Sequence, residues 1–222
     1  MNILGCVVTA VVAYLLGSIP AGYLAGKARG LDIRTVGSGN IGATNVFRIL
    51  GTTAGIVVLV VDGLKGFAAA AWLPDLVHKC LAASEPWDQQ TQEYSRIIAG
   101  MIAILGHNYT CWLKFKGGKG IATSAGVLAA LAPLTFVIGL VVWIVVCVGT
   151  RYVSVASVVA AAVLPLATWA VGYSNRMIVI TAVVAYLLGS IPAGYLAGKA
   201  RGLDIRTVGS GNIGATNVFR IL

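Results

Sequence analysis

Long stretches without a charged side chain constrain this chain of 222 residues more than any other feature. Residues 3–26 form a run of 24 uncharged residues, and another 31 separate Lys119 from Arg151. A helix needs about 20 apolar residues to cross the hydrocarbon core of a bilayer. Only 10% of the residues are charged, whereas a soluble domain has about 25%. The sequence therefore predicts an all-α integral membrane protein.

Seven membrane spans are expected. The run between Lys119 and Arg151 would form a helix of about 46 Å, which is too long for one crossing. Pro133 interrupts this run, so we divide it into two spans. The other five expected spans are residues 3–25, 51–73, 97–113, 152–172 and 177–198.

The distribution of charge predicts the orientation of these spans. The gap after the first span holds four basic residues and one acidic residue, and the gap after the third holds Lys114, Lys116 and Lys119. Residues 74–95 hold four acidic residues and only one lysine. Because positive charge is enriched on the cytoplasmic side, we expect an N-terminus outside and both basic loops in the cytoplasm.

Composition also excludes several classes of site. The 16 lysines and arginines outnumber the 7 acidic residues, but they lie in short gaps between spans, which argues against nucleic acid as a partner. The four cysteines show no paired metal spacing and are expected to act as small apolar residues. No basic residue precedes the first apolar run, so we expect a retained span rather than a cleaved signal peptide.

An internal repeat divides the chain. Residues 181–222 repeat residues 9–50 without a difference over 42 positions. Natural repeats in membrane proteins are diverged, so such identity indicates a very recent duplication, a chimeric gene or an engineered sequence. We expect a membrane domain over residues 1–180, followed by a repeat that completes the seventh span and carries a second glycine-rich loop on the same face.

The first polar motif is GSGNIGATN, residues 37–45, which follows the first span. Its three glycines match the dinucleotide-binding fingerprint, but that fingerprint requires a preceding strand, so we reject a nucleotide site. Converging backbone amides, polar side chains and Arg48 would suit a phosphate group. A glycine turn with helix-capping residues is the alternative.

The second polar motif is HNYTCWLKFKGGKGIAT, residues 107–123, at the end of the third span. Lys116 and Lys119 flank two glycines directly before the next helix, an arrangement that favours an anion. Anchoring of the lysines at the lipid headgroups is the alternative. His107 could be a general base or a hydrogen-bonded histidine between helices.

Asp62 and Lys65 lie three residues apart within the second span. Charges at this depth are costly, so we expect an internal ion pair that fixes helix packing, with a substrate role as the alternative. A transporter or channel lined by these charges is a second class of function, although the polar motifs gather at one membrane face. Ser154 begins the sixth span and by itself indicates only a helix cap.

The segments GSGNIGATNVFR, HNYTCWLKFKGGKGIAT and RYVSVAS, in this order, resemble the bacterial acyl-phosphate:glycerol-3-phosphate acyltransferase family, PlsY. The resemblance covers about residues 1–180. It implies a seven-helix, multi-pass enzyme of the bacterial inner membrane that moves a fatty acyl group from acyl phosphate to the 1-hydroxyl of glycerol 3-phosphate. The products are lysophosphatidate and phosphate, for phospholipid synthesis. The resemblance implies that no metal or cofactor is used. It also implies that membrane lipid surrounds the protein.

The resemblance also implies site residues. Arg48 and Lys116 would hold phosphates and offset charge in the transition state, while Ser38 and Ser154 would orient oxygen atoms. A phosphate oxygen of the substrate would accept the proton of the attacking hydroxyl. The expected substrate-binding residues of the two motifs are Gly37, Gly39, Asn40, Gly42, Thr44, Asn45, His107, Gly117, Gly118 and Lys119.

The chain departs from the family pattern after the seventh span. Family members carry a basic segment there, with a histidine and an asparagine for the site, whereas this chain carries the repeat and has only His78 and His107. The repeat offers Arg206, Asn212 and Arg220 at a different spacing. A catalytically impaired membrane protein is therefore a third alternative.

Overall fold

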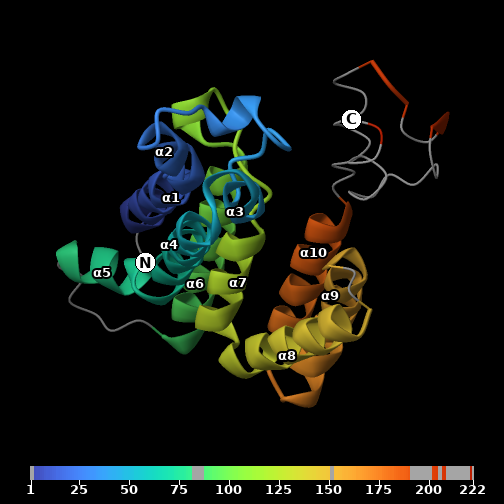
Figure 1. The fold of residues 1–222 in the computed structure, drawn as a ribbon. Helices are drawn as coiled ribbons and strands as arrows, with labels where there is room; N and C mark the ends of the chain where they lie inside the picture. The colour runs from blue at the N-terminus through green and yellow to red at the C-terminus, as the bar shows by residue number, and fades with distance from the viewer. Residues whose placement is uncertain are drawn as a thin grey trace. The chain divides into compact units, whose positions relative to one another are not determined.

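The computed structural model describes residues 3–81, 88–150, 153–190, 202–204, 207, 208 and 221. All regular secondary structure in these residues is helical (Figure 1). The chain divides into two compact units, Met1–Phe136 and Val137–Leu222. Both polar motifs belong to the first unit.

The first expected span is broken into two helices. α1 covers Ile3–Ser18 and α2 covers Ala21–Lys27. Pro20 lies at the N-terminal cap of α2, where its ring and missing N–H prevent continuation of the preceding helix. The apolar stretch Leu4–Lys27 is still long enough to cross a membrane.

The boundaries expected for the second span agree with the observed helix, whereas those expected for the third span do not. α4 covers Thr52–Ala71 and agrees with the second expected span. α6 covers Gln89–Asn108, so the expected boundaries of 97 and 113 were wrong at both ends. α6 begins early because Asp88 caps it, accepting a hydrogen bond from the Thr91 N–H at 2.8 Å. Two short helices were not expected, α3 at Ala43–Leu50 and α5 at Leu73–Cys80.

The helix break expected at Pro133 is confirmed, and the division of this run into two spans stays a prediction. α7 covers Ile121–Leu131 and α8 covers Pro133–Thr150, with the non-helical Ala132 between them. The 11 residues of α7 rise about 17 Å, roughly half the thickness of a hydrocarbon core.

Among its described residues, the second unit contains most of α8 and two further helices. α9 covers Val153–Ala170 and α10 covers Asn175–Ser190. α9 and α10 pack together, with the hydroxyl oxygens of Thr168 and Thr181 3.3 Å apart. The last eight residues of the expected seventh span, 191–198, lie outside the described residues, as does Arg151.

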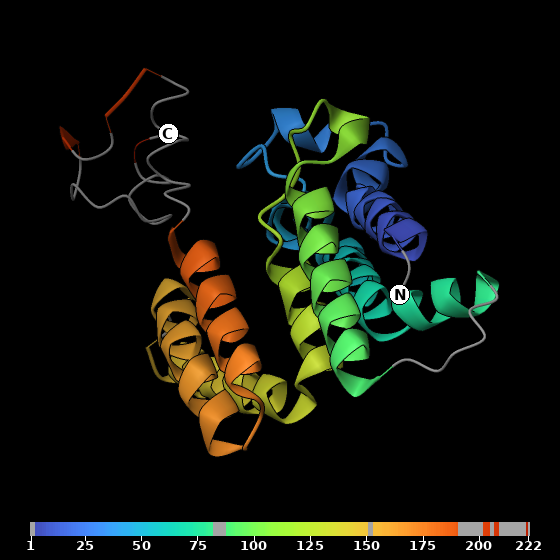
Figure 2. The ribbon, with the colours of Figure 1, turned by 180° about the vertical axis from the view of Figure 1, so that it is seen from behind.

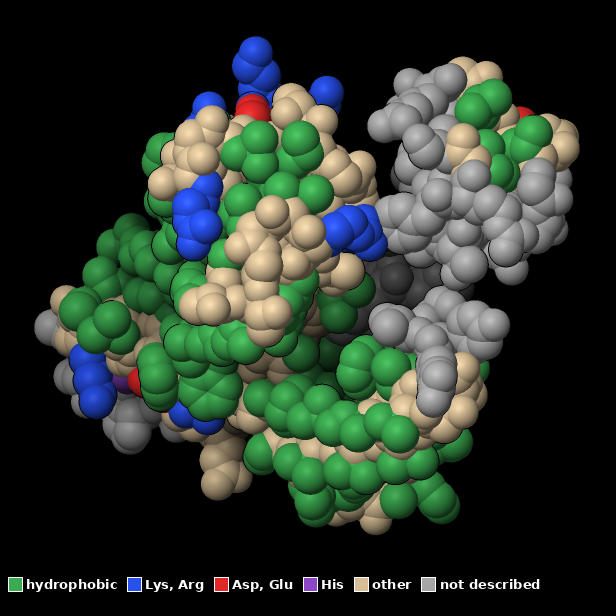
Figure 3. Space-filling model, viewed as in Figure 1, with side chains coloured by type: hydrophobic (Ala, Val, Ile, Leu, Met, Phe, Trp, Pro, Cys, Tyr) green, Lys and Arg blue, Asp and Glu red, His purple; other side chains and the backbone are tan. Residues whose placement is uncertain are grey.

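The apolar surface is that of an integral membrane protein. Three described stretches are long and apolar enough to cross a bilayer: Leu4–Lys27, Thr52–Ala71 and Pro133–Thr150. Large apolar side chains on them face outward, with Leu64 55% and Val148 74% exposed. Figure 3 shows hydrophobic side chains spread over the flanks of the helices. Outward apolar surface of this kind is stable in contact with lipid tails.

Small residues bring the helices of the first unit into close contact. A side chain at Gly66 of α4 would overlap the carbonyl oxygen of Thr123 in α7, and one at Gly126 of α7 would overlap the carbonyl oxygen of Gly63. Such close backbone approach is how membrane helices gain packing energy without a hydrophobic driving force. α4, α6 and α7 thus form a tight support for the loops at their end (Figure 2).

Candidate active site

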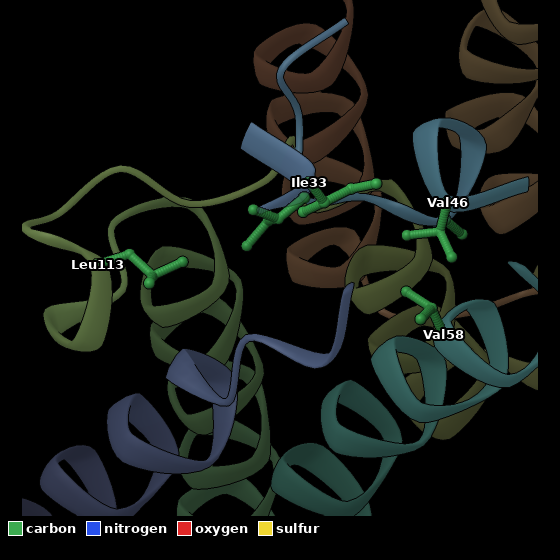
Figure 4. Close-up of a cluster of buried hydrophobic side chains, with 6 residues drawn as sticks. Ile33, Val46, Val58 and Leu113 are labelled. Carbon is green, nitrogen blue, oxygen red and sulfur yellow. The ribbon is translucent and has the colours of Figure 1, made fainter. Parts of the chain in front are cut away.

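The two polar motifs lie at the same end of the first unit. In Figures 1 and 2, the loop between α2 and α4 and the loop between α6 and α7 occupy one end of this unit. Ile33 and Val46 of the first loop segment share a buried cluster with Leu113 of the second and Val58 of α4 (Figure 4). The expectation that these two loops share one face is therefore confirmed.

Asn45 shapes the first loop from within. It lies in α3, is 2% exposed, and its Oδ1 accepts a hydrogen bond from the Ser38 N–H at 2.9 Å. Its Nδ2 donates to the carbonyl oxygens of Ile33 at 3.2 Å and Val36 at 3.1 Å. Gly37 has φ +60°, and any side chain there would overlap Asn45 Oδ1. The Gly37–Asn45 pair thus fixes the path of the loop.

Three backbone amides of this loop are used inside the protein. Besides Ser38, the Gly39 N–H donates to the Val36 carbonyl at 3.1 Å and the Gly42 N–H donates to Asn40 Oδ1 at 2.7 Å. These three amides therefore do not point to an anion, and exposed side chains are further candidates to bind one. Those of Ser38, Thr44 and Arg48 are exposed on this loop.

The second loop is held against the end of α6. The Gly117 N–H donates to the Asn108 carbonyl at 3.0 Å, and the Gly118 N–H donates to the His107 carbonyl at 3.1 Å. Lys114 and Phe115 adopt φ of 55° and 59°, a left-handed conformation that is uncommon for residues other than glycine. These contacts hold the short connection between α6 and α7 in a tight path.

The basic side chains of the second loop face outward. Lys116 and Lys119 are both exposed, and Figure 3 shows basic side chains gathered at this end of the first unit. Partial desolvation by the surrounding loop lowers the pKa of the Lys119 ammonium from its ordinary value. The loop thus offers two cations beside the N-terminus of α7, an arrangement suited to phosphate.

His107 lies beneath this loop and is 4% exposed. Its Nδ1 is 3.5 Å from Asp62 Oδ1, which in turn is 2.8 Å from Lys65 Nζ. The expected ion pair in the second span is therefore confirmed. The side chains of Asp62 and Lys65 are each 3% exposed, so these charges are closed off by packing rather than set along an open path.

Several hydroxyl groups that stabilise the site were missed in the sequence. Thr110 Oγ1 donates to the Ser18 carbonyl at 2.6 Å, and Ser18 Oγ donates to the Gly106 carbonyl at 3.2 Å. Tyr14 donates to the Tyr109 carbonyl at 2.6 Å. These bonds join the end of α1 to the end of α6. The only signal for them is the presence of hydroxyl residues beside Pro20 and the second motif.

The remaining expected site residues fall elsewhere. Ser154 lies in the first turn of α9, in the second unit, and its part in the site stays a prediction. Arg206, Asn212 and Arg220 of the repeat lie outside the described residues.

We expect Asn45→Ala to destabilise the protein. The change removes one acceptor and two donated hydrogen bonds from a buried position, at a cost of about 1–3 kcal/mol. Thermal unfolding in detergent should show a lower midpoint. Asn217→Ala, at the equivalent position of the repeat, is the matched control and should leave the midpoint unchanged. Equal shifts in both variants would contradict the assignment of Asn45 as the residue that shapes this loop.

Comparison with known proteins agrees with this geometry. The sequence profile described as glycerol-3-phosphate acyltransferase matches residues 7–184, and matches again over residues 179–222. A glycerol-3-phosphate acyltransferase of Geotalea daltonii is 43% identical over 182 residues, covering 82% of this chain and 87% of the relative. One of Geobacter sulfurreducens is 44% identical over 177 residues, covering 80% and 84%.

Solved structures show the same likeness. A crystal structure of PlsY, an integral membrane glycerol 3-phosphate acyltransferase in its glycerol 3-phosphate form, matches with a TM-score of 0.70 and 34% identity. The match covers 90% of this chain and 94% of that one. The lysophosphatidic acid form matches with a TM-score of 0.69. The match to the family profile, the identity to these relatives and the similar solved structures agree with the two loops described above. This chain therefore belongs to the glycerol-3-phosphate acyltransferase family.

Proposed function

We propose that this chain, a glycerol-3-phosphate acyltransferase, takes its fatty acyl group from acyl phosphate and releases lysophosphatidate and inorganic phosphate. One observation carries the proposal: two basic loops lie at the same end of a membrane helix bundle, and residues of both loops share one buried cluster. The names of the relatives and the glycerol 3-phosphate and lysophosphatidic acid forms of the similar structures support it.

The chemistry suits these residues because both substrates carry a phosphate. The 1-hydroxyl oxygen of glycerol 3-phosphate attacks the acyl carbonyl carbon, and the bond from that carbon to the phosphate oxygen breaks. The departing phosphate is a good leaving group, so no serine or cysteine nucleophile is required. A phosphate oxygen accepts the proton of the hydroxyl, which makes a side-chain base unnecessary.

Arg48 and Lys116 are proposed to hold the two phosphates and to offset their charge as the acyl group moves. Ser38 and Ser154 are proposed to orient oxygen atoms. The exposed positions of Ser38, Arg48 and Lys116 support this assignment. Asn45 and His107 are buried, so their contribution to binding is proposed to be the shaping of the two loops.

The test is an assay of the purified chain in detergent or lipid. Phosphate release from acyl phosphate should depend on glycerol 3-phosphate, and mass spectrometry should find lysophosphatidate. Acyl thioesters of coenzyme A or of acyl carrier protein, supplied in place of acyl phosphate, should give no product. Product formed only from a thioester would overturn the choice of donor.

We propose a multi-pass protein of the bacterial inner membrane with seven spans, an N-terminus outside and both basic loops in the cytoplasm. The proposal is supported by the basic residues at the loop end of the first unit and by the acidic segment at residues 74–95.

We expect cysteine labelling to report this topology. Cys80 and Lys114 are both exposed. Cys80 ends α5, which follows the far end of the 20-residue α4, whereas Lys114 lies in the second loop, between α6 and α7. In intact cells, a membrane-impermeant maleimide should label a variant that retains only Cys80. It should label a Lys114→Cys variant of a cysteine-free chain only after permeabilisation. The reverse order of labelling would contradict the orientation.

We propose that residues 1–180 form the acyltransferase domain and that residues 181–222 are an added copy of residues 9–50, which completes the seventh span and carries a second glycine-rich loop. The family profile ends one match at residue 184 and begins another at residue 179, which supports a boundary close to this position.

A further inference from the structure

Three ionisable side chains are buried directly below the second loop. Asp62 and Lys65 project from α4 and His107 from α6, with exposures of 2%, 4% and 4%. Charged groups in a membrane bundle are costly unless they are paired, and those that persist usually serve the function of the protein. The chemistry proposed above uses none of the three directly.

These side chains form a continuous line of contacts from α1 to α6. Lys65 Nζ donates to the carbonyl oxygen of Ile19 at 2.9 Å, at the break between α1 and α2. The same Nζ lies 2.8 Å from Asp62 Oδ1, and this oxygen lies 3.5 Å from His107 Nδ1. One edge of the imidazole ring therefore lies against the ion pair, which is itself bonded to the break between α1 and α2.

The opposite edge of the ring meets the second loop. A side chain at Gly118 would overlap His107 Nε2, so the backbone of the loop rests directly on this edge. A side chain at the neighbouring Gly117 would overlap a different atom, the carbonyl oxygen of His107. The imidazole thus lies between the ion pair and Gly118. Gly118 is the second of the two glycines between Lys116 and Lys119.

We propose that His107 is a positioning residue, whose imidazole transmits the fixed position of the Asp62–Lys65 pair to Gly118 and so places Lys116 and Lys119 for the phosphate of a substrate. This inference rests on the proposed function, because it assigns the loop to substrate binding. It gives the buried pair a role in the site beyond helix packing.

The first test separates positioning from folding by its effect on KM. A partly misfolded preparation contains fewer active molecules, which lowers the maximal rate but leaves KM unchanged. His107→Leu should raise the KM of a phosphate-bearing substrate at least fivefold. His107→Asn keeps a polar group on the side of Asp62 and should raise it less. A wild-type KM in His107→Leu would overturn the proposal.

The two glycines provide a matched pair for a second test. Gly118→Ala and His107→Ala should each raise KM, but the double variant should raise it by less than the product of the two factors, because the methyl group gains the space of the imidazole. Gly117→Ala should also raise KM, but its factor should multiply with that of His107→Ala, since alanine retains the backbone carbonyl that the methyl group meets. Identical behaviour of the two pairs would refute the contact between His107 and Gly118 as the cause.

Amide hydrogen exchange tests the proposal without any enzymatic assay. In His107→Leu, residues 114–119 should exchange faster than in the wild type, while residues 38–45 should keep their rates. Unchanged exchange in residues 114–119 would overturn the positioning role. Absence of phosphate release in the wild type would instead overturn the proposed function, and the exchange experiment would still decide the role of His107.

Discussion

Arg48→Ala should lower kcat/KM roughly 10- to 150-fold, because a charge-assisted hydrogen bond to a phosphate contributes about 1.5–3 kcal/mol. Arg48 is exposed on α3, one turn after the buried Asn45 that fixes the loop. Its removal should leave the fold intact. The measurement is the steady-state rate of phosphate release from purified protein at varied concentrations of each substrate.

The repeat supplies the control for this experiment. Arg220 occupies the position equivalent to Arg48 in the second copy. In the first copy, Ile33 and Val46 share one buried cluster with Leu113, which is only 5% exposed and so is already covered. Arg220→Ala should therefore change kcat/KM less than twofold, which a general loss of positive charge would not explain. An equal loss in Arg220→Ala would show that both copies contribute to the site.

Lys116→Ala should lower kcat/KM by a similar factor, again about 10- to 150-fold, because the second phosphate-bearing group would lose its cation. The loop around Lys116 is held by the Gly117 and Gly118 amides rather than by the lysine side chain. The loop should therefore keep its path when the side chain is shortened. Rates and unfolding midpoints measured on the same preparation separate loss of function from loss of fold.

Arg29→Ala is the control for Lys116→Ala. Arg29 is exposed in the loop that follows α2, at the same end of the first unit, and carries the same charge. If Lys116 acts only through the positive potential of this end, both variants should lose activity equally. If Lys116 contacts a phosphate, Arg29→Ala should retain most of the activity. A rate of Lys116→Ala within twofold of the wild type would rule out the phosphate contact.

The sequence by itself determined the class of the protein and the identity of the two loops. Uncharged runs such as residues 3–26 are sufficient to predict membrane helices, because a membrane-spanning helix needs mainly sufficient length and low polarity. Pro133 divided a long run correctly, since the effect of proline on a helix is local. The glycines and lysines of the two motifs likewise predict a phosphate site from local chemistry, and this site stays a prediction.

Local pattern was insufficient where a long-range contact or a cap decided the outcome. α6 begins at Gln89 because Asp88 caps it among residues that are too polar to count as part of a span. The break after α1 is stabilised by Thr110, 92 positions away along the chain, and by Lys65. Hydropathy carries no information on such partners.

Tertiary structure alone decided which motif residues are exposed and which are buried beneath the loops. Asn45 and His107 look in the sequence like ligand-binding residues, but each is buried and contacts a glycine of a loop, Gly37 or Gly118. The physical reason is that a polar side chain in a membrane bundle is stable only where packing brings it a partner, and the partner of His107 comes from α4. Spacing along the chain identifies such residues, whereas only the folded arrangement shows what they contact.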